Sequence, residues 1–376
     1  MVHPVMSHDS PSPESPESAP PASSDHTPSA GDHTPLPGGI LLRLLLRIPA
    51  LRRLLQDRSE EIHRLRESLL HDLERRNAAQ QAEIARLDAA RAEAAQQSPQ
   101  LYEPPGHYYS PIVDPDDEWV RRAMEREAHP ETPPSEFGID ENEMLRWFDK
   151  IAARYPAHPF PEQPAPGRLY HYANPSFPLA DALALLGFLA EVRPRRYVEV
   201  GAGYSSCAAI DINEQYLGGT LRMTFIEPHP ETALELFGAG SRYCACVLPQ
   251  RLQDTPLSLF TDLDAGDVLF IDSSHVGKTG SDVLDYLFRI LPQLRPGVLV
   301  HVHDIFYPFE YPKVWIVDQN RSWNEAYFLR AFLCANPRFR VLYLSSWIYR
   351  CRRHLFETRM PLCIQHAGGS LWMQSV

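Results

Sequence analysis

The second half of the chain predicts an α/β fold in which a mostly parallel sheet is covered by helices on both faces. Seven short apolar runs have the pattern of strands, at residues 197–200, 221–226, 244–248, 268–271, 298–302, 340–344 and 370–373. Segments of helical length separate many of them, at 205–212, 231–237, 281–291 and 323–334. Strands that alternate with helices favour parallel pairing, and such sheets bind ligands beyond the carboxyl ends of their strands.

The chain begins with segments that lack the composition of a folded domain. Residues 1–38 are rich in Pro and Ser and hold almost no large apolar side chains, so we expect a disordered tail. Residues 39–57 are apolar and basic and predict an amphipathic segment. Within it, the stretch 40–55 is too short, and too interrupted by Arg43, Arg47 and Pro49, for a membrane span. We expect it either to contact a membrane surface or to pack on the protein itself.

Residues 58–97 predict one long helix, because they contain no Gly or Pro and are dense in Glu, Arg, Ala and Gln. Their apolar side chains recur at helical spacing, at Ile62, Leu65, Leu69, Leu70, Leu73, Ile84 and Leu87. These follow two heptad frames one residue apart, so the helix either pairs as a coiled coil in a homodimer or docks on its own chain. A linker and cap region is expected at 98–175, and the α/β domain at 176–376.

Charge and cysteine content narrow the classes of function. The net charge is −12 and no long Lys/Arg run occurs in the second half, which argues against nucleic acid as a partner. None of the six cysteines has CxxC spacing with a matching second pair, so we expect buried, reduced thiols. No signal-peptide pattern opens the sequence, and we therefore expect a cytoplasmic protein.

A glycine turn follows the first predicted strand. In YVEVGAGYSS, at 197–206, a strand leads into Gly201 and Gly203 and then into a helix, so the backbone can approach a nucleotide-like ligand closely. Ser206 takes the place of the third glycine of the dinucleotide fingerprint, which argues against a nicotinamide-dependent oxidoreductase. Glu227 closes the next strand, 26 residues after Gly201, where a carboxylate can accept hydrogen bonds from ribose hydroxyls. The alternative is a turn without a ligand, and a carboxylate that caps the following helix.

Acidic and imidazole side chains follow the fourth and fifth strands. Asp272 ends the fourth strand, and His275 lies three residues later. His301, His303 and Asp304 lie at the end of the fifth. Because parallel strands end at one edge of a sheet, we expect these groups to converge on a chemical site. In the alternative, Asp272 contacts the cofactor or a helix N-terminus and His275 is a loop residue, while strand alternation from His303 turns His301 into the core.

These motifs resemble those of class I S-adenosylmethionine-dependent methyltransferases, in a bacterial branch similar to O-methyltransferases. The resemblance rests on E-V-G-x-G at 199–203, on Glu227 and on D-V-L-F-I-D at 267–272, and it covers residues 102–373. It implies a Rossmann-like seven-stranded sheet whose last strand is antiparallel. It also implies a cofactor site in which Glu199 holds the methionine part, Glu227 the ribose and Gln253 or Asp254 the adenine, with Gly201, Gly203, Tyr204 and Asp272 completing the set.

Metal-dependent O-methyltransferases of the catechol type are similar at the chemical site. They bind a divalent ion through acids after the fourth and fifth strands, and Asp272, His303 and Asp304 match those positions. His275 stands where many of them carry a lysine base, and an imidazole can take a proton near neutral pH. A neutral His303 would suit Mn²⁺, Fe²⁺, Co²⁺ or Zn²⁺ better than Mg²⁺, which prefers oxygen ligands. Metal-free chemistry is the alternative.

Together these features predict methyl transfer to a hydroxyl oxygen of a small molecule or a carbohydrate, with His275, Asp272 and Asp304 as catalytic residues. An aromatic wall is expected beside the acceptor, formed by Tyr307, Phe309, Tyr311 and the segment 323–325. The alternative function is a catalytically weak, methyltransferase-like scaffold that its coiled coil localises.

Overall fold

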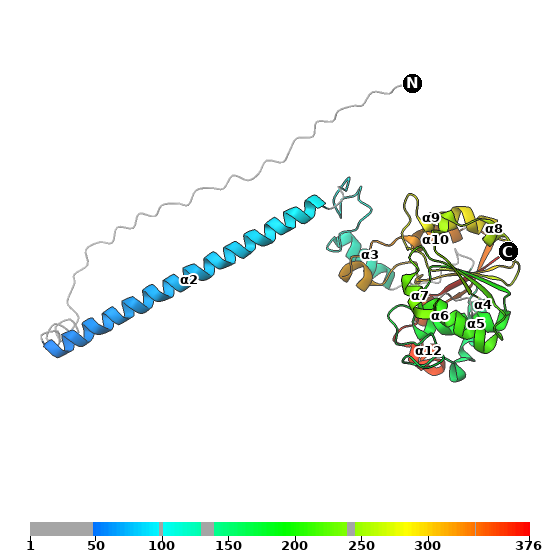
Figure 1. Ribbon diagram of the computed structural model, residues 1–376, viewed down its shortest axis with the longest axis horizontal. Coiled ribbons are helices and arrows are strands. Elements are labelled where there is room, and N and C mark those ends of the chain that lie inside the picture. Colours follow the sequence, from blue (N-terminus) through cyan, green and yellow to red (C-terminus); the bar gives the residue numbers. More distant parts are fainter. Residues whose placement is uncertain (1–47, 98–100, 129–138, 239–244, 335) are drawn as a thin grey trace, which may run out of the picture. The chain divides into compact units, whose positions relative to one another are not determined.

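The computed structural model describes residues 48–97, 101–128, 139–238, 245–334 and 336–376 (Figure 1). The chain divides into two compact units, residues 1–99 and 100–376, which we describe separately. The tail expected at 1–38 lies outside the described residues, as do residues 39–47 of the basic segment and Cys244.

The first unit contains one long helix, α2 (Pro49–Gln97), as predicted for residues 58–97. The helix begins at Pro49, so this proline starts the helix where we expected it to interrupt the basic segment. Proline is well suited to a first helical position, because its N–H would have no partner there in any case. Apolar side chains along the helix are exposed, with Ile62 and Leu65 each 64% accessible. No helix among the described residues is long and apolar enough to cross a membrane.

The second unit is built on a seven-stranded sheet in the order β3-β2-β1-β4-β5-β7-β6. The strands are β1 (Arg196–Val200), β2 (Arg222–Ile226), β3 (Ala245–Leu248), β4 (Val268–Ile271), β5 (Leu299–Val302), β6 (Phe339–Leu344) and β7 (Leu371–Ser375). Strands β1 to β5 pair in parallel, whereas β7 is antiparallel to both β5 and β6. The Rossmann-like fold, the strand number and the antiparallel last strand are therefore confirmed, with strand ends within two residues of prediction.

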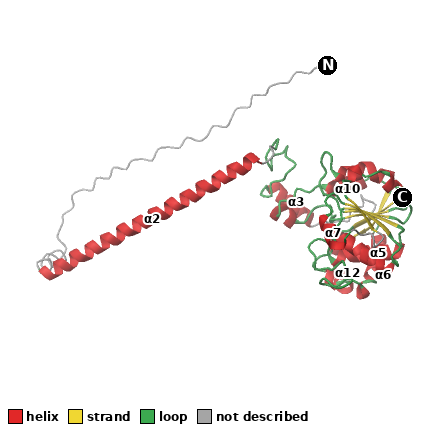
Figure 2. Ribbon diagram, viewed as in Figure 1, coloured by secondary structure: helices red, strands yellow, loops and turns green. Residues whose placement is uncertain are grey.

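Helices cover both sides of the sheet, with α10 on one side and α5 and α6 on the other (Figure 2). They are α3 (Glu118–Ala128), α4 (Glu141–Ala152), α5 (Leu179–Val192), α6 (Tyr204–Tyr216), α7 (Glu231–Phe237), α8 (Ser258–Thr261), α9 (Asp282–Asp285), α10 (Glu325–Leu333), α11 (Ser345–Cys351) and α12 (Arg353–Arg359). Helix α9 continues through a π-helical turn, Tyr286–Ile290, so the two together occupy the helix predicted at 281–291.

Two helices correct the sequence analysis. Helix α5 was not predicted, because its residues are buried on every side from Leu179 to Leu189 and the apolar residues form no stripe. Helix α4 lies in the region expected to be a linker and cap, yet Phe148 and Ile151 are fully buried in the main core. The core therefore begins before residue 176.

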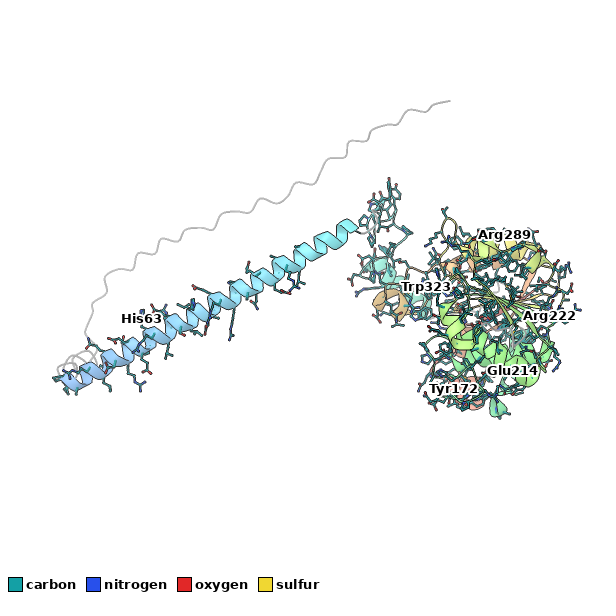
Figure 3. All side chains as sticks on the ribbon, viewed as in Figure 1. His63, Tyr172, Glu214, Arg222, Arg289 and Trp323 are labelled. Carbon is teal, nitrogen blue, oxygen red and sulfur yellow. The ribbon has the colours of Figure 1, made fainter. Side chains whose placement is uncertain are left out.

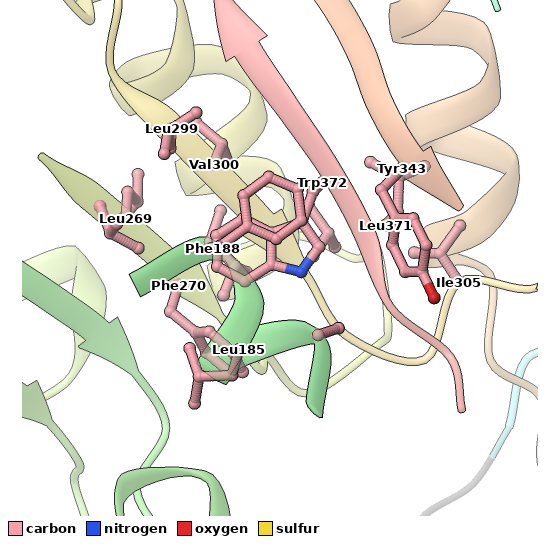
Figure 4. Close-up of a cluster of buried hydrophobic side chains, with 14 of the residues drawn as sticks. Leu185, Phe188, Leu269, Phe270, Leu299, Val300, Ile305, Tyr343, Leu371 and Trp372 are labelled. Atoms are coloured by element: carbon pink, nitrogen blue, oxygen red, sulfur yellow. The ribbon is translucent and has the colours of Figure 1, made fainter. Parts of the chain in front are cut away.

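Aromatic rings connect these helices to the sheet. Phe188 of α5 stacks on Trp147 of α4 at 3.9 Å and on Trp372 of β7 at 4.1 Å between ring centroids (Figure 4). Phe270 of β4 stacks on His301 of β5 at 4.0 Å. Planar contacts of this kind fix the position of the sheet, and with it the strand ends that form the site.

Candidate active site

The turn after β1 requires a glycine. Gly201 has φ +84°, and a Cβ atom there would lie 2.3 Å from the carbonyl oxygen of Asp272. The Gly201 N–H donates to Ile226 O at 2.9 Å, and the Asp272 N–H donates to Val200 O at the same distance. Gly203 is extended, with φ −174°, and its Cβ direction is open for 4 Å. The turn is thus fixed between the ends of β2 and β4.

Glu227 lies at the edge of this turn. Its Oε2 accepts a hydrogen bond from the Ala202 N–H at 3.2 Å, and its Oε1 accepts one from the His229 N–H at 2.8 Å. The side chain is half-buried. The ends of β1 and β2 therefore bring a carboxylate and a glycine turn together, as the strand pattern predicted.

Glu199 is the residue before the last in β1 and has no exposed surface. Its Oε1 accepts hydrogen bonds from the hydroxyls of Ser205 and Ser206, at 2.5 and 3.0 Å. Its Oε2 has no hydrogen-bond partner among the described residues. Burial raises the pKa of this carboxyl to about 8, although the two serines oppose the shift. The Ser206 hydroxyl also accepts a hydrogen bond from the Gly203 N–H at 3.2 Å. Ser206, which replaces the third glycine of the dinucleotide fingerprint, therefore stabilises the turn.

The remaining predicted cofactor residues flank this turn or lie in a loop further along the chain. Tyr204 begins α6, and its ring contacts that of His171 at 5.5 Å between centroids. Gln253 lies in the short 3₁₀ turn Leu252–Asp254 and donates from Nε2 to Gly280 O at 2.7 Å. Asp254 is exposed to solvent. Gln253 is thereby tied to the loop that follows β4.

His275 joins the ends of β4 and β5 to the start of α10. Its Nδ1 lies 2.7 Å from Oε2 of Glu325, and its Nε2 lies 3.5 Å from Asp272 Oδ1 and 3.8 Å from Asp304 Oδ2. The ring is 6% exposed. The loop places it by a left-handed backbone conformation, with φ +60° at His275. The predicted chemical residues Asp272, His275 and Asp304 therefore lie together.

Glu325 is a site residue that the sequence analysis did not identify as such. It is fully buried, and its Oε1 accepts hydrogen bonds from the Ser273 hydroxyl at 2.6 Å and the Tyr286 hydroxyl at 2.7 Å. The residue was placed in an aromatic wall on the strength of its neighbour Trp323. The sequence marks Glu325 only as an acidic residue near the beginning of a predicted helix. Acidic residues are common in the first turn of any helix, so this position does not indicate a site.

The charges around His275 bear on its predicted role as a base. Burial lowers the pKa of the ring, but Asp272 and Glu325 together outweigh it and raise the pKa to about 11. Such a pKa favours the imidazolium form of His275 near neutral pH, which argues against its predicted role as a neutral base. Burial alone would raise the pKa of the Asp272 carboxyl. The positive charges of His303 and His275 outweigh burial and hold this pKa below the ordinary value. Burial raises the pKa of Asp304, against the opposing charges of His303 and His275.

His301 of β5 and His303, the residue after the strand, have ring centroids 5.7 Å apart. His301 lies in the core, as the alternative expected, but strand alternation is not the reason, because residues two apart in a strand share a face. His301 is buried, neither nitrogen has a partner among the described residues, and burial lowers its pKa well below the ordinary value. It is a core residue.

His303 lies beside the chemical site and lines the same cavity as Asp272 and Asp304. It is buried, and its Nε2 lies 3.6 Å from Asp304 Oδ1. Over the parts of the chain that the structure describes, no three His, Cys, Asp or Glu side chains are arranged to hold a metal ion. The predicted trio of Asp272, His303 and Asp304 thus gains no support from the geometry, and a metal stays a prediction.

A cavity of about 1120 Å³ opens beside these strand ends. Asp181, Asp272 and Asp304 line one part of it. The aromatic residues on its wall include Tyr172, Phe306, Tyr307, Tyr311, Trp315 and Trp323, of which Tyr172 and Trp323 are labelled in Figure 3. Of the predicted aromatic wall, Tyr307, Tyr311 and Trp323 line the cavity, whereas Phe309, Asn324 and Glu325 do not, and Phe309 is 1% exposed and packs in the core. Basic residues Lys313, Arg321 and Arg350 also line the cavity.

Comparisons with known proteins agree with this geometry. The family model described as a methyltransferase domain matches residues 198–305, which span the glycine turn and both acidic strand ends. An uncharacterized protein of Archaeoglobus fulgidus is 34% identical over 168 residues, covering 43% of this chain and 73% of that protein.

Solved structures are similar at lower identity. A methyltransferase of Podospora anserina, solved with S-adenosylhomocysteine bound, is 15% identical and is matched over 70% of this chain and 98% of its own, with a TM-score of 0.35. An O-methyltransferase of Bacillus cereus in complex with the same molecule is 14% identical over 68% and 96% of the two chains, with a TM-score of 0.33.

Proposed function

Because the chain belongs to the class I S-adenosylmethionine-dependent methyltransferases, we propose that it methylates a hydroxyl oxygen of a small molecule or carbohydrate bound in the cavity. The position of Asp272 carries the proposal. Its carbonyl oxygen closes the turn at Gly201, and its side chain lines the cavity beside His275. One residue thereby joins the cofactor turn to the space where an acceptor would bind.

The residues around the glycine turn fit the cofactor. The turn leaves no room for a Cβ at Gly201, Glu227 presents a carboxylate at its edge, and Glu199 has an unpartnered buried oxygen among the described residues. We assign the methionine part to Glu199, the ribose to Glu227, the adenine to Gln253 and Asp254, and close contact with the ligand to Gly201, Gly203, Tyr204 and Asp272. When bound, S-adenosylmethionine supplies a methyl group on a positively charged sulfur.

We assign Asp304 as the proton acceptor. Its carboxylate lines the cavity, and its raised pKa lets it hold an acquired proton better than an exposed aspartate would. As the new O–CH₃ bond forms, the S–CH₃ bond breaks and its electron pair stays on sulfur. The hydroxyl proton passes to Asp304 and then to water. In-line displacement needs the two reacting atoms held in contact, which the adjoining turn and cavity would provide.

His275 has a positioning role in this scheme. It lies behind the two carboxylates, outside the lining of the cavity, and Glu325 fixes its other nitrogen. Its positive charge faces both Asp272 and Asp304 within 3.8 Å. We therefore propose that turnover needs no divalent metal. Activity lost on treatment with EDTA and restored by Mn²⁺ would instead return Asp272, His303 and Asp304 to the role of metal ligands.

The proposal is tested with S-adenosylmethionine and a panel of phenols, sugars and amines, with mass spectrometry of the products. We expect a methyl ether and S-adenosylhomocysteine in equal amounts. Asp304→Asn should lower kcat by roughly 100-fold or more while leaving S-adenosylhomocysteine affinity unchanged. Asp318→Asn, a matched change at an exposed aspartate, should behave as wild type. Methylation only of amines, or full activity of Asp304→Asn, would contradict the assignment.

A further inference from the structure

Arg321 is held on the cavity wall by two indole rings. Its guanidinium carbon lies 4.5 Å from the ring centroid of Trp315 and 4.6 Å from that of Trp323. Its backbone N–H donates to Trp315 O at 2.9 Å. The side chain is half-buried. Stacking of this kind fixes the plane of a guanidinium without using its N–H donors.

In the described part of the chain, the contacts of the Arg321 guanidinium are with these two indole rings, and its donors are not paired with an acceptor there. Half-buried arginines elsewhere are paired: Arg289 binds Asp285 at 2.7 Å, and Arg196 binds Asp267 at 2.7 Å. Glu310, an acid in the lining of the same cavity, accepts hydrogen bonds from the Tyr311 N–H at 2.9 Å and from the Tyr327 hydroxyl. Lys313 adds a second positive charge to the lining.

Trp323 connects this cationic position to the chemical residues. Its ring contacts the guanidinium of Arg321 and also lies 4.3 Å from the ring of His275, which pairs with Asp272 and Asp304. The Trp323 indole and the His275 imidazole thus link the guanidinium to the carboxylate pair. Arg321, Asp272 and Asp304 all line the same cavity.

From this arrangement we infer that the methyl acceptor carries an anionic group, a carboxylate or a phosphate, and that Arg321 binds it while the hydroxyl points toward Asp304. The inference rests on the proposed function and names its substrate class. A fork of N–H donors matches either anion in two-point contact, which a neutral acceptor cannot use.

The test compares ligands that differ only in the anionic group. Wild-type protein saturated with S-adenosylhomocysteine is titrated with D-glucuronate, glucose 6-phosphate and glucose, and binding is followed by calorimetry and by intrinsic tryptophan fluorescence. We expect at least one anionic sugar to bind roughly tenfold or more tightly than glucose. Its binding should weaken by a similar factor in Arg321→Gln. The carboxylate and phosphate arms identify which anion is preferred.

Two further variants make the result decisive. Arg222→Gln, at an exposed arginine on β2, is the matched control and should leave all affinities unchanged. Arg321→Lys keeps the charge but loses the two-point contact, so it should restore anion binding only in part. Equal binding of glucose and both anionic sugars, no binding of either anion, or wild-type affinity in Arg321→Gln would overturn the inference. Because each titration begins with measured S-adenosylhomocysteine binding, failure at that first step would instead count against the proposed function.

Discussion

Nδ1 of His275 lies 2.7 Å from Oε2 of Glu325, although 50 residues separate the two along the chain. The contact joins the loop after β4 to the first residue of α10 and directs the other ring nitrogen toward Asp272 and Asp304. The orientation of the catalytic carboxylates is thus linked to a fully buried acid outside the cavity lining.

Glu325→Gln should lower kcat by roughly 10- to 100-fold and leave S-adenosylhomocysteine affinity unchanged. The amide keeps the shape of the side chain but removes one of the charges that raise the pKa of His275. The alkaline limb of the pH–kcat profile should therefore move to lower pH. Glu231→Gln, at an exposed residue of α7, is the control. If kcat falls equally at every pH and the pH–kcat profile does not shift, Glu325 has only a structural role.

The pH dependence of unfolding gives a second prediction. The pKa of His275 is raised from its ordinary value of 6.5 to about 11 in the folded protein. Its contribution to stability is therefore full below pH 6.5 and is lost as the pH rises toward 11. Urea unfolding of wild type and His275→Gln should differ most near pH 6 and progressively less up to pH 10. A difference that stays constant over this range would mean that the ring is not held as an imidazolium.

Two glycine-to-alanine variants test whether the turn after β1 requires a glycine at Gly201. Gly201→Ala places a Cβ 2.3 Å from the Asp272 carbonyl at a φ of +84°, and should cost about 2 kcal/mol or more in the free energy of unfolding. Gly203→Ala adds the same atom to an extended residue with open space, and should change stability far less. Denaturant unfolding of the ligand-free proteins measures both. Equal stabilities would show that the turn relaxes at Gly201.

Glu227→Ala should weaken S-adenosylhomocysteine binding by about 10- to 100-fold, because it removes the carboxylate that we assign to accept hydrogen bonds from the two ribose hydroxyls. Glu227→Gln should lie between this variant and wild type. The variant also loses the hydrogen bonds from Ala202 and His229, so a thermal melt accompanies each titration. Normal affinity in a folded Glu227→Ala protein would place the ribose elsewhere.

The exposed apolar side chains of α2 predict a homodimer of the full chain in analytical ultracentrifugation. Leu69, 62% exposed, belongs to the first heptad frame, and Leu69→Glu should shift the equilibrium to monomer. Gln81→Glu introduces the same charge on the same helix at an exposed polar position and should leave the dimer intact. A wild-type chain that stays monomeric at high micromolar concentration would favour docking on its own chain.

The sequence predicted those site residues that directly follow a strand. The glycine turn, Glu227 and Asp272 each follow directly from a strand whose apolar run is unmistakable, so their meeting at one sheet edge could be predicted. Helix α5 could not be predicted, because complete burial removes the periodicity that marks a surface helix. Asp181, which it carries to the cavity, was missed with it.

The protonation of His275 shows a different limit. The spacing from Asp272 identified the residue, but its state depends on Glu325, which α10 brings to Nδ1. A lone imidazole has a pKa near neutrality, and only the assembled charges make it an imidazolium. The pKa of His275 depends on charges from residues far apart in the sequence, and the spacing of residues along the chain does not show which of them come together.

The most direct test of the account is calorimetric titration of the full chain with S-adenosylhomocysteine, alone and with Mn²⁺ or Mg²⁺. We predict saturable binding in the micromolar range that the metals leave unchanged and that Glu227→Ala weakens. Absence of binding to a folded protein would contradict the cofactor site, and would favour a methyltransferase-like scaffold localised by α2.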